Sequence, residues 1–201
     1  MKLEHKRIIK WMDYVRYQNH LSQEFSNAFF PSQLESKNWL IKILAAFIDQ
    51  KPVGDIYCLG GWFGILPQLL RDNKILGSAG TIYSVDKDPF CASVLNQITY
   101  KKDNIVPVIH RLETFEYPTT PSIIINTICE HISQEEYEQW LDKCPINTVI
   151  VLQSNNLEID EHVNTSSSLN EFEEKSKLEV LYKNELALKD FTRYMIIGKK
   201  K

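Results

Sequence analysis

Three glycines and one acid are spaced as a ligand site would require. An apolar run at residues 56–59 leads into Gly60, Gly61 and Gly64, and a helical pattern follows. A second apolar run ends in Asp86, about 20 residues after the last glycine. Glycines let the main chain approach a ligand closely, and a carboxylate at a strand end can accept hydrogen bonds from two ribose hydroxyls. This order predicts a site for a nucleoside-containing cofactor.

Further candidate groups follow the later apolar runs. Asn126 ends an isoleucine-rich run, and Glu130 and His131 come shortly after it. A histidine near neutrality can take a proton from a hydroxyl or amine, and a neighbouring carboxylate can orient it. The alternative is that His131 packs at the start of the next helix while Glu130 is solvated. We therefore treat Asn126, Glu130 and His131 as catalytic candidates.

Amides and a histidine follow the fifth apolar run. Gln153, Asn155 and His162 suit hydrogen bonding to a small polar substrate, although amides are also common in loops. His131 and His162 with nearby acids could in principle hold a metal ion. The sequence has no zinc-type ligand spacing, and its four cysteines form no C-x-x-C pair. No metal is predicted.

The hydrophobic pattern places these groups at strand ends. Five strand-and-helix steps followed by two more strands predict an α/β protein with a Rossmann-like, doubly wound seven-stranded sheet and a C-terminal antiparallel hairpin, preceded by N-terminal helices. The predicted strands are residues 55–59, 81–85, 105–110, 122–127, 147–152, 178–183 and 192–198. Ser133 and Glu136 form a Ser-x-x-Glu box that predicts a helix start. Ligands of such sheets bind beyond the carboxyl ends of the strands.

The first 50 residues predict a helical extension. Apolar residues recur at helical spacing over residues 7–29 and again after Pro31. We expect residues 1–50 to form a helical lid and residues 51–201 to form the cofactor-binding domain. Aromatic side chains could line the pocket, with Tyr14 as a substrate-binding candidate, or could simply pack the helices on the sheet.

Composition limits the function classes. The chain has 201 residues, of which 43% are hydrophobic and 24% charged, and a net charge of −3, so nothing indicates a nucleic-acid-binding polycation. The charged N-terminus has no apolar core of a signal peptide, and no run reaches the roughly 20 residues of a membrane span. We expect reduced thiols and a cytoplasmic protein. Oligomeric state is not indicated.

The glycine turn and the string Val85-Asp86-Lys87-Asp88-Pro89 together resemble those of the class I S-adenosylmethionine-dependent methyltransferases. Strings such as Gly-Gly-Trp-Phe-Gly and Asn-Thr-x-Cys-Glu-His are similar to small phage-type members of that superfamily. The resemblance covers about residues 53–198 and implies S-adenosylmethionine as cofactor. It implies that the cofactor is held by Gly60, Gly61, Trp62, Gly64, Asp86, Lys87, Arg111 and Leu112.

The chain departs from this family pattern in two places, at the first-motif acid and at the middle glycine. Cys58 stands where the first motif has an acid, and Asp55 lies three residues too early to replace it. The middle glycine is replaced by Gly61 or by Trp62, depending on the alignment. The Pro-Pro-aromatic string of amino-group DNA methyltransferases is missing after Asn126. Cys129 could be compared with the nucleophile of pyrimidine C5-methyltransferases, but the flanking proline is absent, so a core position is the better interpretation.

The resulting hypothesis is a methyltransferase acting on a polar acceptor, a small molecule or one of modest size. Two alternatives stay open. The chain could be a non-catalytic Rossmann-like binding protein, which the missing acid favours. It could also catalyse another S-adenosylmethionine reaction such as aminocarboxypropyl transfer, because a fold does not determine a reaction.

Overall fold

The computed structural model describes residues 4–18, 22–48, 54–75 and 80–200. The helices are α1 (His5–Arg16), α2 (Ser22–Asn27), α3 (Pro31–Ile48), α4 (Ile65–Asp72), α5 (Pro89–Ile98), α6 (Gln134–Lys143) and α7 (Leu169–Ser176). The strands are β1 (Ile56–Leu59), β2 (Ile82–Asp86), β3 (Ile105–Ile109), β4 (Ile123–Asn126), β5 (Val149–Asn155), β6 (Leu178–Ala187) and β7 (Thr192–Lys200). The short 3-10 turns are η2 (Lys101–Asp103), η3 (Leu112–Thr114) and η4 (Cys129–His131).

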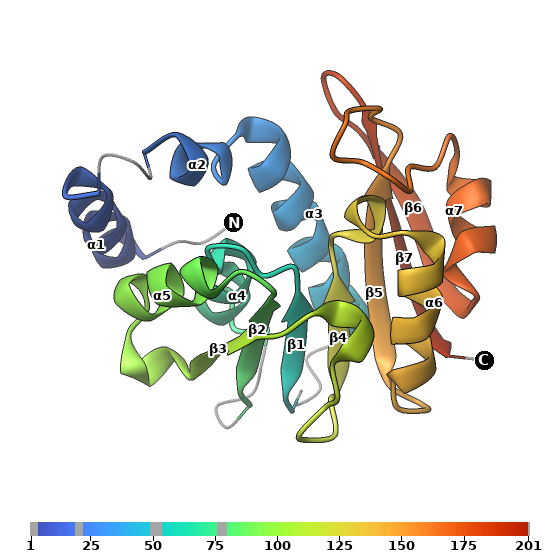
Figure 1. Cartoon of the computed structure of the whole chain (residues 1–201), viewed down its shortest axis with the longest axis horizontal. Coiled ribbons are helices and arrows are strands. Elements are labelled where there is room, and N and C mark those ends of the chain that lie inside the picture. Colours follow the sequence, from blue (N-terminus) through green and yellow to red (C-terminus); the bar gives the residue numbers. More distant parts are fainter. Residues whose placement is uncertain (1–3, 19–21, 49–53, 76–79, 201) are drawn as a thin grey trace.

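The predicted fold class is confirmed. One seven-stranded sheet has the order β3-β2-β1-β4-β5-β7-β6, and its first five strands are parallel (Figure 1). The hairpin of β6 and β7 closes one edge, with β7 antiparallel to both β5 and β6. The strand order reverses between β1 and β4, and ligands of open α/β sheets bind at such a switch point.

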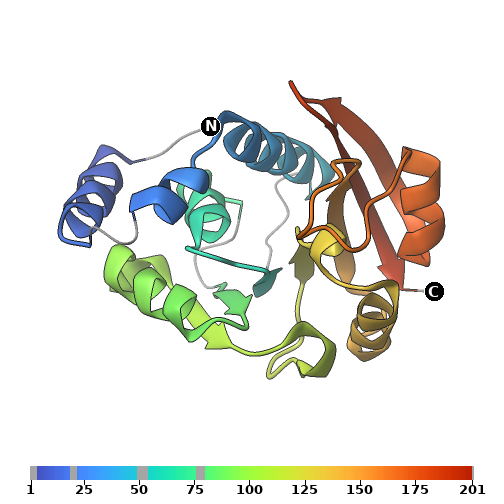
Figure 2. The same ribbon diagram turned by 45° about the horizontal axis from the view of Figure 1, so that its top comes forward.

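Alternation along the strands divides the core into two layers. Ile56 and Cys58 pack with α1 to α5, whereas Tyr57 and Leu59 pack with α6 and α7 on the other face. Figure 2 shows the two groups of helices on opposite sides of the sheet. Since α1, α2 and α3 bury Trp11, Phe25 and Leu40 in the same cluster as the strands, these helices share the core of the sheet. The expected boundary between residues 50 and 51 lies outside the described residues.

Local signals explain the helix ends. Ser133 accepts a hydrogen bond from the Glu136 amide, and Glu136 accepts one from the Ser133 amide, so the predicted capping box is confirmed. The helical pattern predicted a break at Pro31, and the structure has one: α2 ends at Asn27 and α3 begins at Pro31, where proline's fixed φ and missing N–H suit a first helical turn. No helix in the described part of the chain is long and apolar enough to cross a bilayer.

The fifth strand is longer than predicted. The sequence pattern ended it at Leu152, but β5 runs to Asn155, so Gln153 and Asn155 belong to the strand and not to the loop. The reason is tertiary: β7 supplies antiparallel pairing as far as Asn155 opposite Arg193. Polar residues can remain in a buried strand when its neighbour satisfies their backbone groups.

Candidate functional site

A large cavity lies beyond the carboxyl ends of the parallel strands. Its volume is about 1020 Å³, at the upper end of the range for ligand sites, and α2 and α3 contribute to its walls. Twelve predicted site residues line it: Gly60, Gly61, Trp62, Asp86, Lys87, Arg111, Leu112, Glu130, His131, Gln153, Asn155 and His162. Gly64, Asn126 and Tyr14 are not among the described residues that line it. Tyr14 packs instead against the hydrophobic core.

The glycine turn has three left-handed residues. Gly60 has φ 64°, Trp62 has φ 44° and Gly64 has φ 72°. A side chain at Gly60 would meet Ile128 Cγ2 at 2.2 Å, which explains the glycine there. Trp62 thus adopts the left-handed conformation that glycine adopts most readily. A non-glycine residue there costs about 1–2 kcal/mol.

Asp86 is held by the turn that it faces. Its Oδ2 accepts a hydrogen bond from the Trp62 amide at 2.8 Å, and its Oδ1 accepts one from the Asp88 amide at 3.1 Å. Asp88 in turn caps α5 by accepting from the Phe90 amide at 2.8 Å. The Asp86 carboxylate is half-buried at the cavity wall, and each oxygen retains a lone pair. This geometry fits a pair of ribose hydroxyls.

No acid takes the usual place at the end of the first strand. Cys58 is buried at the cavity wall, and burial raises the pKa of its thiol, so it carries no charge. Asp55 lies at the opposite end of β1, where its carboxylate accepts from the Thr81 amide and the Thr119 hydroxyl, both at 2.8 Å. Recognition of charge at this end of the cavity must come from other side chains.

The end of β3 places two more predicted residues at the wall. The Arg111 side chain is 61% exposed, and its guanidinium forms an ion pair with Glu113 and a longer one with Glu136 at 3.8 Å. Leu112 is buried in η3 and presents an apolar surface to the same cavity. An apolar wall beside the Asp86 carboxylate is a surface on which a planar ring can pack.

The turn after β4 brings Glu130 into the cavity but leaves Asn126 beneath it. The Asn126 side chain is fully buried, and its Oδ1 accepts from the Ile128 amide at 3.0 Å. Its Nδ2 has no hydrogen-bond partner among the described residues. Glu130 Oε1 accepts from Asn155 Nδ2 at 2.5 Å and from Arg193 Nη1 at 2.6 Å. Asn126 thus shapes the turn, while Glu130 faces the cavity.

The two predicted histidines meet above this turn. Their ring centroids are 4.6 Å apart and the rings are nearly perpendicular. His131 Nδ1 lies 3.2 Å from the Glu161 carbonyl, and His162 Nδ1 lies 2.6 Å from the Leu157 carbonyl. The sequence suggested that a neighbouring carboxylate orients His131, but a backbone carbonyl does so here. Because a carbonyl only accepts, this contact assigns a proton to Nδ1 of each ring, and the neutral tautomer that makes it has its lone pair on Nε2.

The loop that carries His162 is fixed to the turn that carries His131. The Glu130 carbonyl accepts from the Val163 amide at 2.9 Å and from the Asn164 amide at 3.1 Å. The Ser166 amide donates to the Asn155 carbonyl at 3.0 Å. These main-chain bonds hold two segments about 30 residues apart in register.

Cys129 is a core residue. It is 2% exposed, its Sγ lies 3.8 Å from the Asn126 carbonyl, and burial raises the pKa of its thiol well above the usual value. A nucleophilic cysteine must be accessible and deprotonated, and Cys129 is neither.

Sequence reasoning missed Ser36, Lys37 and Arg193. Ser36 donates from Oγ to Gln153 Oε1 at 3.2 Å, which ties α3 to β5. Burial lowers the pKa of the half-buried Lys37 ammonium to about 7, and the positive charge of Arg193 adds to this effect. Only Arg193 gave a usable signal, as a lone cation in an otherwise apolar strand pattern.

Comparisons with known proteins find similarity in structure only. No family model matches the chain, and no curated protein matches it in sequence. Magnesium protoporphyrin IX methyltransferase from Synechocystis PCC 6803, solved with bound S-adenosylmethionine, superposes with a TM-score of 0.67 and 8% identity, covering 100% of this chain and 99% of that one. N-methyltransferase NodS from Bradyrhizobium japonicum WM9 gives a TM-score of 0.63 and 12% identity over 86% of this chain and 98% of that one.

A third solved structure, TehB from Haemophilus influenzae, gives a TM-score of 0.59 and 15% identity over 91% of this chain and 66% of that one. NodS has also been solved with S-adenosylhomocysteine. The resemblance to phage-type proteins is not tested by these structures and stays a prediction. At such low identities the likeness concerns the fold, and the chain has the fold of the class I S-adenosylmethionine-dependent methyltransferases.

Proposed function

We propose that this protein is a methyltransferase that uses S-adenosylmethionine and modifies a polar acceptor, a small molecule or one of modest size. The proposal rests on one observation: a single cavity runs from the glycine turn and Asp86 to the polar groups after β4 and β5. Similar folds have been solved with S-adenosylmethionine or S-adenosylhomocysteine bound, which supports this choice of cofactor.

The nucleoside end is assigned to residues of the first three strand ends. Asp86 accepts the ribose hydroxyls, and the Trp62 and Asp88 amides keep its carboxylate in position. Gly60 and Gly61 form the wall where the backbone comes close to the ligand, and Lys87, Arg111 and Leu112 border the base. Since Cys58 is uncharged, recognition of the amino-acid end falls to Glu24, Ser36 and Lys37, which line the cavity from α2 and α3.

The acceptor end is assigned to the groups after β4 and β5. When bound, S-adenosylmethionine supplies an electrophilic methyl group on its sulfonium. The protein's contribution is to position the acceptor in line with that methyl and to exclude water. His131 lines the cavity and uses Nδ1 for the Glu161 carbonyl, so Nε2 of the neutral ring is the atom that accepts a proton from a hydroxyl or amine. Gln153, Asn155 and His162 border the same space and bind the polar acceptor.

The N-terminal helices act as a lid in this proposal. Glu24 and Asn27 of α2 and Gln33, Ser36 and Lys37 of α3 line the cavity, so α2 and α3 close its open side. Tyr14 supports these helices from the core and does not contact the substrate. The four cysteines are free thiols, in keeping with the predicted cytoplasmic location.

Calorimetry with S-adenosylmethionine tests the proposal. Asp86→Ala removes hydrogen bonds to a charged group, each worth about 1.5–3 kcal/mol, so two ribose contacts predict at least about 100-fold weaker binding. Asp142→Ala, which removes an exposed acid from α6, is the matched control and should bind as the wild type does. A folded wild-type protein that binds no S-adenosylmethionine at millimolar concentration would refute the cofactor and favour a non-catalytic binding protein.

Product analysis tests the reaction type. Methyl transfer releases S-adenosylhomocysteine, whereas aminocarboxypropyl transfer releases methylthioadenosine. Detection of methylthioadenosine in place of S-adenosylhomocysteine would keep the cofactor site and overturn the proposed reaction.

A further inference from the structure

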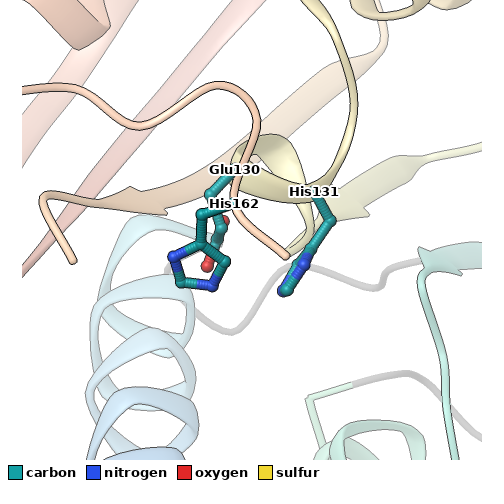
Figure 3. Close-up of side chains that lie close together, drawn as sticks. All are labelled: Glu130, His131 and His162. Carbon is teal, nitrogen blue, oxygen red and sulfur yellow. The ribbon is translucent and has the colours of Figure 1, made fainter. Parts of the chain in front are cut away.

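Glu130, His131 and His162 form a cluster that the proposed transfer does not by itself explain. Their candidate ligand atoms all lie within 4.8 Å of one another. Figure 3 shows the three side chains gathered where the His162 loop passes the turn of Glu130 and His131. All three line the cavity, at the end assigned to the acceptor.

Both imidazoles are prepared as metal ligands. Each Nδ1–H donates to a backbone carbonyl, Glu161 for His131 and Leu157 for His162. This second hydrogen bond fixes the ring orientation and leaves the Nε2 lone pair available, as is usual for histidines that bind metals. The main-chain bonds from Val163 and Asn164 to the Glu130 carbonyl hold the two segments in place without any ion.

Glu130 supplies an independent observation. Its side chain is 2% exposed, and its Oε1 is held by Asn155 and Arg193. Its Oε2 is buried and has no hydrogen-bond partner among the described residues. An unsatisfied buried carboxylate oxygen is costly, so a partner is expected for it.

The ligand set indicates the class of ion. Two neutral imidazoles and one carboxylate match the ligands of catalytic zinc and non-heme iron sites, whereas Mg²⁺ and Ca²⁺ prefer oxygen ligands. Arg193 already offsets the charge of Glu130, which further disfavours ions that depend on anionic oxygens. We propose that Glu130 Oε2 and the Nε2 atoms of His131 and His162 bind one divalent transition-metal ion.

The position of this site suggests its use, which rests on the proposed methyl transfer. Three protein ligands leave coordination positions open to the cavity, so the ion binds an acceptor that presents a hydroxyl oxygen. That hydroxyl loses its proton to water, the oxygen forms the bond to the methyl carbon, and the carbon–sulfur bond breaks with its electron pair left on sulfur. In this arrangement His131 coordinates the ion and does not take the proton.

Titration with Co²⁺ tests the site on full-length protein first treated with a chelator. We expect one Co²⁺ per chain, with the intense visible absorption of a four- or five-coordinate site. His131→Ala and His162→Ala should each weaken Co²⁺ binding at least about 100-fold. Loss of a residue that only supports a ligand weakens metal binding by up to about 100-fold, so loss of a ligand should weaken it at least as much. His110→Ala is the matched control, because His110 also lines the cavity and also bonds a backbone carbonyl through Nδ1.

The outcomes separate this site from the proposed function. The metal site is overturned if the wild type binds less than one Co²⁺ per chain, or if His162→Ala binds Co²⁺ as tightly as the wild type. It is also overturned if His110→Ala loses as much Co²⁺ affinity as His131→Ala and His162→Ala. Glu130→Gln adds a check on the third ligand, with circular dichroism to confirm that the Arg193 region stays folded. S-adenosylmethionine calorimetry in the presence of chelator reports on the cofactor alone, so failure there with normal Co²⁺ binding refutes the methyltransferase and leaves the metal site standing.

Discussion

Arg7→Met should cost the protein about 3–5 kcal/mol of folding free energy. Arg7 lies in α1, is 1% exposed and binds the buried Asp103 carboxylate and the partly buried Asp72 carboxylate. It donates to Asp72 at 2.7 and 3.0 Å and to Asp103 at 2.8 and 3.3 Å, and its Nη1 also donates to Gln68 at 2.9 Å. Removing the arginine leaves the charges of its carboxylate partners uncompensated. Breaking a buried ion pair in this way costs about 3–5 kcal/mol.

The stability lost in Arg7→Met should depend on pH. Burial acts to raise the pKa of the Asp103 carboxyl, but hydrogen bonds from Arg7 and the Tyr100 amide bring it below its usual value. In the wild type this contribution is present above the unfolded-state pKa and is lost as pH falls through the folded-state value. Without Arg7, Asp72 and Asp103 have lost the cation that binds them both, so one of the two carboxyls takes up a proton more readily. The difference between variant and wild type should therefore shrink as pH falls from about 7 to about 4.5.

Urea unfolding followed by circular dichroism measures both effects. Arg111→Met is the control, because the Arg111 guanidinium is largely exposed and solvent screens its ion pair, so its removal should change the free energy of unfolding little. Adding Asp72→Asn and Asp103→Asn to Arg7→Met should recover part of the loss, since no unpaired buried charge then remains. A cost for Arg7→Met no larger than that of Arg111→Met would refute the reasoning.

Three further predictions concern one residue each: Lys37, Gly64 and Cys129. Lys37→Met should stabilise the protein by about 2–4 kcal/mol below pH 7, because the folded protein holds this ammonium with a pKa of about 7. The gain should become smaller as pH rises from 7 toward the unfolded-state pKa. Urea unfolding measures this trend, and Lys42→Met, which changes an exposed lysine, should not show it. Gly64→Ala should destabilise by about 2–4 kcal/mol in thermal unfolding, since φ is 72° and the new Cβ would meet Leu95 Cδ1 at 2.2 Å; an unchanged midpoint contradicts this. Cys129→Ser should retain turnover, and lost turnover in a folded variant would restore the nucleophile hypothesis.

Local patterns sufficed for the architecture. Apolar periodicity, the Ser133 capping box and the glycine turn are encoded within a few residues of each other, so the sequence predicted the parallel strands and the terminal hairpin. The strand ends and Asp86 followed from this, because every parallel strand ends at the same edge of its sheet. Predictions were less accurate where a distant strand decided the outcome, as for β5, which β7 extends to Asn155.

The sequence by itself determined the order of the elements, the glycine turn and the strand-end groups, because these depend on chemistry between near neighbours in the chain. Only the tertiary structure decided that Trp62 takes the left-handed conformation. It also brought Arg193 to Glu130, 63 residues away, and His162 to His131. Such pairs have no mark in local spacing, since they form only when separate strand ends converge on one cavity.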